Sequence, residues 1–159
     1  MAFDGIAVAN IVFELKNSLI GGRIDKIYQP HKDEIIMSVR NNGTSKLLLS
    51  ANPSHPRLHI TKIQKENPMT APMFCMVLRK HIAGSRITNI SQEGLERIVY
   101  IDVEAMNEMG DMVLRRLIIE IMGKHSNIIL SDENGKILDS IKHISHETSS
   151  VREVLPGKE

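Results

Sequence analysis

Short apolar segments separated by turn residues dominate the chain, and two longer segments repeat with a helical period. The first helix is predicted to run from Asp4, which can cap it, to Leu19, and Gly21-Gly22 provides a stop. The second helix is predicted to begin near Ala71-Pro72, since proline suits a first helical turn, and to end at Gly84. Two helices are therefore expected.

The other apolar segments are short and rich in β-branched residues, so they predict strands. Asn41-Asn42-Gly43 lies between two of them and signals a β-hairpin, and Pro30 is expected to close the first strand. Segments of strand character cover residues 23–29, 34–40, 44–50, 58–61, 86–92, 95–104, 111–122, 126–131 and 136–144. Residues 111–122 alternate least cleanly, and a helix there is the alternative. The pattern predicts an α+β fold with one antiparallel system of seven or eight strands and two helices.

The composition is that of one globular domain. The chain has 159 residues, of which 42% are hydrophobic and 25% charged, enough for a single core. One cysteine excludes an internal disulfide and a multi-cysteine zinc site, and an aromatic content of 3% weakens an interpretation as a stacking platform for single-stranded nucleic acid. The first residues lack the basic and apolar regions of a signal peptide, and the apolar runs are too short to cross a bilayer. A soluble, cytoplasmic protein is expected.

The charge is unevenly distributed along the chain. The net charge is +1, but residues 51–92 hold six Lys and Arg against one acidic residue, a local charge of +5, and residues 93–120 hold seven acidic residues against three Arg, a local charge of −4. A basic middle segment can meet phosphate, because cations that neutralise phosphates release condensed counterions. A solvated loop and helix face explains so small an excess more simply.

Some residues have chemistry suited to a site, and each also has a structural explanation. None of the seven histidines stands with cysteines or a carboxylate cluster, so no metal site is predicted. Cys75 lies on the apolar side of the second helix and is expected to be packed and inert. Arg115-Arg116 lies in a strand, which places one guanidinium on each face.

A strand entrance and a polar turn are candidates for binding an anion. Glu96-Arg97 at a strand entrance offers a guanidinium fork to phosphate or to a base edge. Gly123-Lys124-His125-Ser126-Asn127 offers backbone amides, a lysine and a hydroxyl between two apolar strands. Two exposed charges and an ordinary hairpin loop are the simpler explanations, and the residues alone favour them.

Several segments, taken in order, are similar to one known family. They are Phe3-Asp4-Gly5, residues 21–24, residues 27–30, residues 46–53, residues 72–81, residues 94–97, residues 120–130 and residues 154–157. On these segments the chain resembles, over essentially its whole length, the N-terminal domain of the NFACT family of RqcH-type, NEMF-type and fibronectin-binding protein A-like proteins. The resemblance implies an antiparallel β-sandwich-like domain similar to the N-terminal domain of formamidopyrimidine-DNA glycosylase.

The resemblance also implies a role in ribosome-associated quality control. Family members bind large ribosomal subunits that hold a stalled peptidyl-tRNA and recruit aminoacyl-tRNA for template-free tailing, with alanyl-tRNA as the expected substrate in the bacterial branch. Peptide-bond chemistry would belong to ribosomal RNA, so no catalytic residue, cofactor, metal or membrane contact is expected in this chain. Met1-Ala2 also lacks the proline that the glycosylases use as nucleophile.

The family's tRNA-related motif is an acidic residue near the N-terminus together with an Asp-Arg pair. By position it falls on Asp4, Glu96 and Arg97, where Glu96 stands in place of the usual Asp and lengthens the arm by one methylene. Auxiliary phosphate contacts are expected from five further basic residues. These are Arg57, Arg79, Lys80, Arg86 and Lys124.

The expected domain covers residues 1–146, and residues 147–159 are expected to be a polar tail that leads to further regions of a longer protein. Two other functions remain as alternatives. One is a surface adhesin that binds fibronectin, as the older family label suggests, although the missing secretion signal and the single cysteine disfavour it. The other is a nucleic-acid binder of the DNA glycosylase type, which rests on the fold alone.

Overall fold

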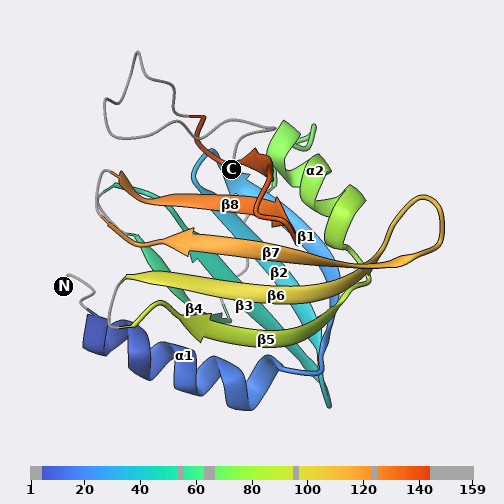
Figure 1. Cartoon of the computed structure of the whole chain (residues 1–159). Coiled ribbons are helices and arrows are strands. Elements are labelled where there is room, and N and C mark those ends of the chain that lie inside the picture. Colours follow the sequence, from blue (N-terminus) through green and yellow to red (C-terminus); the bar gives the residue numbers. More distant parts are fainter. Residues whose placement is uncertain (1–4, 54–55, 63–66, 95–96, 123–124, 144–159) are drawn as a thin grey trace.

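The computed structural model describes residues 5–53, 56–62, 67–94, 97–122 and 125–143. Two helices and nine strands occur among them, which confirms the α+β class and corrects the expected number of seven or eight strands to nine (Figure 1). In chain order they are α1 (Gly5–Leu19), β1 (Arg23–His31), β2 (Glu34–Arg40), β3 (Thr44–Ser50), β4 (Arg57–Thr61), α2 (Met73–Ile82), β5 (Arg86–Gln92), β6 (Ile98–Met106), β7 (Met112–Glu120), β8 (Asn127–Asp132) and β9 (Ile137–Ser140). Within these ranges, neither helix is long and apolar enough to span a membrane.

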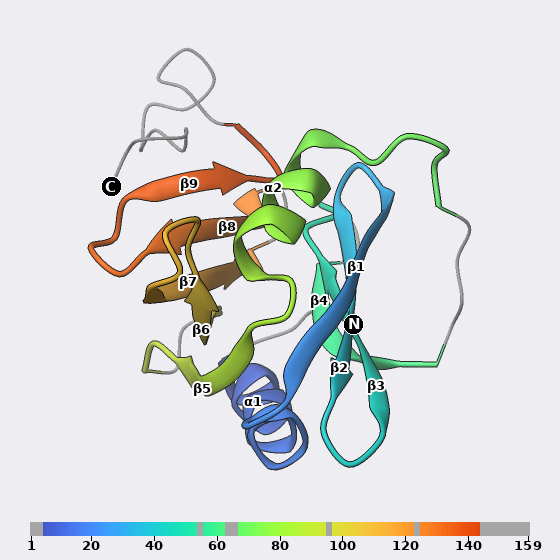
Figure 2. The same ribbon diagram turned by 90° about the vertical axis from the view of Figure 1, so that its right-hand side faces the viewer.

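The nine strands form one antiparallel ladder in the order β4-β3-β2-β1-β5-β6-β7-β8-β9. The ladder is weakest between β1 and β5, which share a single register pair, Arg23 with Arg86. At this point the sheet turns, so that the half from β4 to β1 lies across the half from β5 to β9 (Figures 1 and 2). The result is the expected sandwich-like domain, with the core between the two halves.

A set of backbone hydrogen bonds holds this junction. The Gly21 amide donates to the Ile87 carbonyl and the Ile87 amide donates to the Gly22 carbonyl, both at 2.8 Å. The Gly84 amide donates to the Ile24 carbonyl at 2.7 Å. Glycine is required at position 22 because a Cβ there would lie 2.8 Å from Val39 Cγ1, closer than carbon atoms can pack. The end of α1, the start of β1 and the start of β5 are therefore fixed together.

The prediction that the first strand closes at Pro30 is wrong, because β1 continues to His31. Proline lacks an N–H and is accepted in a strand only where no ladder bond is needed. Pro30 lies in an irregular part of the β1–β2 pairing, between the register pairs made by Tyr28 and His31. On its other side β1 pairs with β5 only at Arg23, so β1 behaves as an edge strand at this point.

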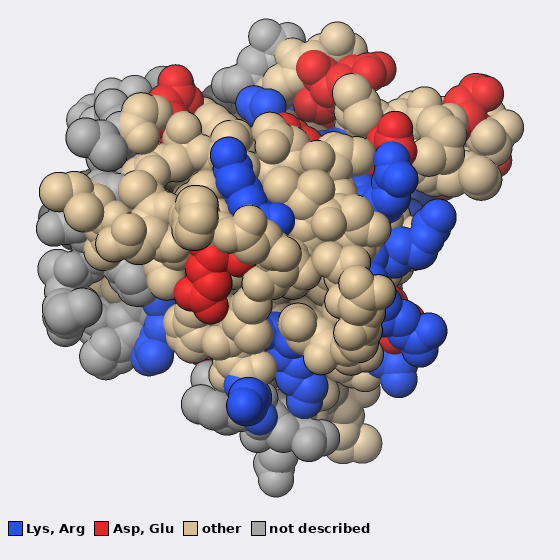
Figure 3. Space-filling view, turned by 90° about the horizontal axis from the view of Figure 1, so that it is seen from below, with Lys and Arg blue, Asp and Glu red and all other residues tan. Residues whose placement is uncertain are grey.

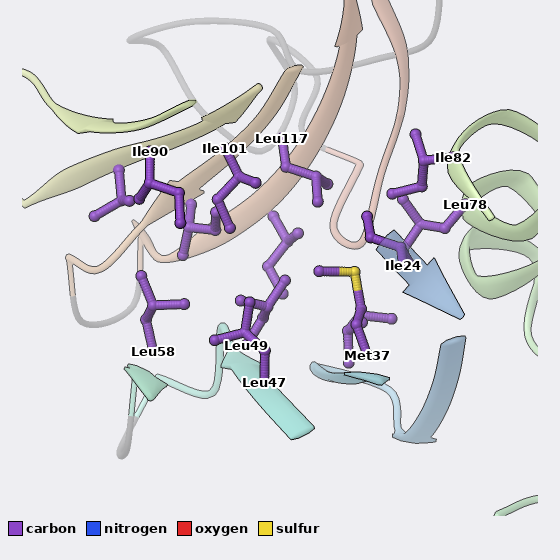
Figure 4. Packing of buried hydrophobic residues seen from close by; sticks show 14 of the residues in the cluster. Ile24, Met37, Leu47, Leu49, Leu58, Leu78, Ile82, Ile90, Ile101 and Leu117 are labelled. Atoms are coloured by element: carbon purple, nitrogen blue, oxygen red, sulfur yellow. The ribbon is translucent and has the colours of Figure 1, made fainter. Parts of the chain in front are cut away.

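One hydrophobic cluster fills the space between the two halves of the sheet (Figure 4). Leu49 and Met37 contribute from the first half, Ile101 and Leu117 from the second, and Leu78 from α2. All five side chains are fully buried. Burial of this apolar surface is the main stabilising contribution to the fold, at roughly 25 cal/mol per Å².

Cys75 belongs to the same cluster, which confirms the prediction of a packed thiol. Its Sγ lies 3.5 Å from the Ile27 carbonyl, and burial raises the pKa of the thiol. A thiol whose pKa is raised holds less of the reactive thiolate, so Cys75 is not poised as a nucleophile.

The two leucines of β7 provide a matched test of the core. Leu117 is fully buried, whereas Leu114 on the opposite face of the strand is 48% exposed. We expect Leu117→Ala to lower the free energy of unfolding by about 2–5 kcal/mol, because it leaves a cavity between the sheets. Leu114→Ala is expected to change the free energy of unfolding by about 0.5 kcal/mol or less. Urea denaturation measures both, and equal losses would contradict the assignment of the core.

Candidate functional site

Arg97 lies in the turn between β5 and β6, at one end of the sandwich. The turn is tight, with Gly94 in the left-handed region at φ +56 and the Glu93 amide donating to the Ile98 carbonyl at 3.2 Å. Arg97 is exposed, and none of the described carboxylates forms an ion pair with it. Its guanidinium is therefore available to a ligand as far as the described residues are concerned.

The first turn of α1 lies at the same end of the molecule. The helix packs along β5 and runs in the opposite direction (Figures 1 and 2). Its end is bonded to the start of β5 through Gly21, Gly22 and Ile87. The 15 residues of α1 span about 22 Å and the seven of β5 about 23 Å. The start of α1 is consequently level with the end of β5 and with the Arg97 turn.

The turn that follows β7 also reaches this end. The Ile121 amide donates to the Arg97 carbonyl at 2.9 Å. The chain then turns at Met122, whose amide donates to the Ser126 hydroxyl oxygen at 2.8 Å. His125, in the same turn, is exposed. The Arg97 turn and the turn that follows β7 are thus neighbours in space. The strand predicted from residue 95 begins at Ile98, so Arg97 belongs to the turn before it.

Asp4, Glu96 and Lys124 lie outside the described residues, so their expected roles remain predictions. Each adjoins a described residue at this end of the sandwich. Asp4 precedes Gly5 at the start of α1, Glu96 precedes Arg97, and Lys124 precedes His125. Of the three residues expected to contact tRNA, Arg97 is the one that the structure describes.

A polar network lies next to Arg97 on the outer face of β6 and β7. The Tyr100 hydroxyl donates to the Glu93 carboxylate. The Arg116 guanidinium donates to Asp102 through two bonds, at 2.7 and 3.3 Å, and lies 4.4 Å from the centre of the Tyr100 ring. This network was not among the predicted site residues. Hairpin register was the available signal, since Asp102 and Arg116 are paired across the turn at residues 107–110.

The network alters the ionisation of its members. The bond to Glu93, burial and the Glu93 charge raise the pKa of Tyr100 to about 12. The hydrogen bond to Asp102 raises the pKa of Arg116. The aromatic ring and the carboxylate both interact favourably with the Arg116 cation. Two described carboxylates of the face beside Arg97, Glu93 and Asp102, are therefore already hydrogen-bonded within the protein.

The four described residues among the expected auxiliary phosphate contacts are spread over several elements, and Lys124 lies outside the described residues. Arg86 pairs with Glu104 at 3.4 Å at the opposite end of the β5–β6 hairpin. Lys80 pairs with Glu108 at 3.3 Å, and Arg79 donates to the Ile27 carbonyl at 2.8 Å. Arg57 begins the edge strand β4 and is exposed.

The register instead places three arginines side by side. Arg23, Arg40 and Arg86 occupy neighbouring positions on β1, β2 and β5. Arg23 and Arg40 lie outside the basic segment found in the sequence, so the sequence did not indicate this row. Lys and Arg side chains gather along the corresponding side of the molecule, where α1 ends (Figure 3).

A cavity of about 710 Å³ lies between β1, α2 and β9. His143 Nε2 lies 2.6 Å from the Asp139 carboxylate, as expected for a hydrogen-bonded histidine. The Ser140 hydroxyl in the same cavity donates to the Lys142 carbonyl at 2.8 Å. The described ranges contain no group of three or more His, Cys, Asp and Glu able to hold a metal.

Residues 4–159 match the family described as NFACT N-terminal and middle domains. The chain belongs to the NFACT family. This confirms the family resemblance from which the site residues were predicted.

Three curated relatives illustrate the range of similarity. The chain is 49% identical over 161 residues to the Rqc2 homolog RqcH of Bacillus subtilis, which covers 100% of the chain and 28% of the relative. It is 46% identical over 159 residues to the protein of that name in Streptococcus pneumoniae, and this match covers 99% of the chain and 29% of the relative. Identity to the human ribosome quality control complex subunit NEMF is 28% over 151 residues, and this match covers 94% of the chain and 13% of the relative. The chain thus spans less than a third of these relatives.

Two solved structures have the same fold. The N-terminal domain of fibronectin-binding protein PavA from Streptococcus pneumoniae matches with a TM-score of 0.95 and 46% identity, over 99% of this chain and 60% of that one. The N-terminal part of the fibronectin/fibrinogen-binding protein from Streptococcus suis matches with a TM-score of 0.94 and 42% identity, over 99% of this chain and 60% of that one.

The Tyr100–Glu93 bond gives the site a measurable signature. The raised pKa favours the protonated phenol in the folded state, so the pair stabilises the fold below the ordinary tyrosine pKa of about 10 and loses this effect as the pH rises toward about 12. Glu93→Gln should lower the pKa of Tyr100 toward the ordinary value. Ultraviolet titration in a Tyr28→Phe background isolates Tyr100, because the chain has two tyrosines. Glu104→Gln is the control and should leave this pKa unchanged.

Proposed function

We propose that this chain is the tRNA-contacting module of a ribosome-associated quality control factor. In this proposal the whole protein binds large ribosomal subunits that hold a stalled peptidyl-tRNA, in the cytoplasm. It recruits aminoacyl-tRNA, alanyl-tRNA in particular, for template-free tailing of the nascent chain. The observation that carries the proposal is the exposed Arg97 at the end of the sandwich where α1 begins, in a chain that matches RqcH and NEMF proteins over almost its whole length.

The position of Arg97 suits contact with a nucleic acid. A planar guanidinium binds a phosphate through two parallel hydrogen bonds, and it also binds the acceptor edge of guanine. The backbone at Arg97 is held by the bond from Ile121, so little ordering is needed when a ligand binds. On the neighbouring face the Arg116 guanidinium balances the charge of the Asp102 carboxylate, which would otherwise repel phosphate.

Asp4 and Glu96 are assigned supporting roles in the proposal. In the sequence Asp4 precedes the first residue of α1 and Glu96 precedes Arg97, and these two described residues lie at the same end of the sandwich. A carboxylate can orient the guanidinium or accept a bond from a base amino group. The longer arm of Glu96, compared with the usual Asp, demands a different side-chain conformation to reach the same partner.

The proposal gives this chain a binding role and no bond-making step. Cys75 is buried with a raised pKa, and the Ser140 hydroxyl is bonded to a backbone carbonyl. His143 is held by Asp139. The thiol, the hydroxyl and the imidazole of these three residues are thus committed to structural contacts, and peptide-bond formation is left to ribosomal RNA.

The double variant Glu96→Ala, Arg97→Ala tests the assignment. We expect tRNA affinity of the 159-residue chain to fall by about tenfold or more, because charge-assisted hydrogen bonds contribute about 1.5–3 kcal/mol each. The same variant should abolish alanine tailing in a chimaera in which this chain replaces the matching 161-residue region of the Bacillus subtilis RqcH. Fluorescence anisotropy measures the first and mass spectrometry of a stalled nascent chain the second.

Lys26→Gln is the matched control, because it removes one exposed charge from β1 and Lys26 is not among the expected phosphate contacts. It should change affinity and tailing little. The melting temperature of the double variant should stay near that of the parent chain, since Arg97 makes no described ion pair. Asp4→Ala is unsuitable alone, because Asp4 is also predicted to cap the first helix, and losing such a cap would cost about 1 kcal/mol of stability. Full tailing by the double variant would refute the site.

Fibronectin binding is a second candidate, favoured by the names of the two similar structures. Adhesion and tRNA binding predict different behaviour of the same chain. On the proposed function, surface plasmon resonance should detect RNA binding that weakens steeply with salt and depends on Arg97. Binding to immobilised fibronectin that persists in Glu96→Ala, Arg97→Ala, with no binding to tRNA, would favour the adhesin.

A further inference from the structure

A second pocket lies at the end of the sandwich remote from Arg97, between the C-terminal turn of α2 and the β6–β7 hairpin. Its volume is about 460 Å³. The hairpin projects from the molecule beside the lower end of α2 (Figure 1). The pocket is lined by Lys80, His81, Met106, Asn107, Glu108, Met109 and Arg115. Eight residue steps of β6 separate Ile98 from Met106, so this pocket lies about 27 Å from the Arg97 turn.

Arg115 is the unusual residue of this pocket. Along β7 it lies on the same face as Leu117 and Ile119, which belong to the core, whereas Arg116 points outward to Asp102. The alternation predicted from the Arg115-Arg116 pair is therefore confirmed. Arg115 Nε is buried and has no hydrogen-bond partner among the described residues. A buried guanidinium donor without a partner costs free energy, which a bound acceptor would recover.

Positive charge exceeds negative charge among the residues that line the pocket, and Asp132 lies opposite Arg115 in the β7–β8 register, outside the lining. Lys80 and His81 come from the last turn of α2, and Arg115 comes from β7. Glu108, from the hairpin turn, is the acidic residue of the lining; it lies 3.3 Å from Lys80, and its side chain is 83% exposed. Burial and the charges of Arg115 and Lys80 lower the pKa of His81, and Glu108 opposes them. The groups that face His81 thus leave an excess of positive potential.

Basic residues near a helix C-terminus have an ordinary explanation, because they interact favourably with the helix dipole. That explanation covers Lys80 and His81. It does not cover Arg115, which belongs to a strand and turns a donor inward. We propose that this pocket binds a phosphate group, held by Arg115 and Lys80 and bordered by His81. The methionines Met106 and Met109 add flexible apolar side chains to the lining.

Two sources supply such a group: a phosphodiester of RNA, or a small free phosphate compound. The pocket is open to solvent at the exposed hairpin residues Glu108 and Met109, so an extended ligand can enter. This site is separate from Arg97, and phosphate binding here does not depend on the proposed tRNA contact. Failure of one proposal therefore leaves the other standing.

Nuclear magnetic resonance titration of His81 tests the proposal on the 159-residue chain. Inorganic phosphate is compared with sodium chloride at equal ionic strength, with the His81 signal assigned by a His81→Asn variant. A bound anion beside the ring should raise the pKa of His81 by about 1, since an opposite charge within a few ångströms favours the protonated imidazole. No rise in phosphate beyond that in chloride, at the highest phosphate concentration tested, would overturn the proposal.

Two pocket variants and one control locate the anion. Arg115→Gln should abolish the phosphate-dependent rise in the pKa of His81, and Lys80→Gln should reduce it. Lys80 is exposed, so Lys80→Gln remains informative if Arg115→Gln lowers stability. Arg57→Gln removes one charge outside the pocket and should leave the rise intact. An unchanged rise in both Lys80→Gln and Arg115→Gln would overturn the assignment of the site.

A short single-stranded RNA distinguishes the two sources. If the phosphodiester is the ligand, the RNA should raise the pKa of His81 at concentrations at least tenfold below those needed for inorganic phosphate. If both act at similar concentrations, the pocket takes small phosphate compounds. Arg97→Ala should leave the response of His81 to inorganic phosphate unchanged, and a loss of that response would contradict two separate sites.

Discussion

The hydrogen-bonded junction between β1 and β5 is the constraint on which the rest of the structure depends. These strands share one register pair, so the ladder turns there and the two halves of the sheet enclose a single core. Gly22 has no room for a side chain at this point. The bonds of Gly21 and Gly22 to Ile87 also fix the direction of α1 along β5, which brings the start of α1 level with Arg97. A few backbone hydrogen bonds at the β1–β5 junction therefore determine which residues lie together at each end of the sandwich.

Most of the secondary structure was accessible from the sequence, because it depends on local patterns. The alternation of apolar residues and the turn at residues 41–43 predict the hairpin that the register shows. The strand end predicted at Pro30 was wrong, because whether a strand tolerates proline depends on the pairing at its two edges. That pairing is set by distant segments of the chain. The turn of the whole sheet at Arg23 and Arg86 has the same origin, and no local pattern reports it.

The candidate site was predictable in part, for a related reason. Charged residues that are close in the sequence do not necessarily form a surface patch, because the two ends of a seven-residue strand lie about 23 Å apart. Arg86 and Arg97 therefore lie at opposite ends of one hairpin, although 11 positions separate them in the sequence. Hairpin register, by contrast, can be read locally. It places Asp102 opposite Arg116 once the turn is located, and this pair with Tyr100 forms the polar face beside Arg97.

The two ends of the sandwich differ in how they would hold a nucleic acid. Arg97 is exposed in a turn, so a phosphate or base bound there stays largely in water and its contribution is screened by salt. Arg115 lines a pocket and is half-buried, so an anion bound there would be less screened than at Arg97. Sites about 27 Å apart share no side chains, so their binding free energies should add if one RNA spans both. Because a second contact by the same molecule is intramolecular, even a weak site at Arg115 would then raise the affinity gained at Arg97.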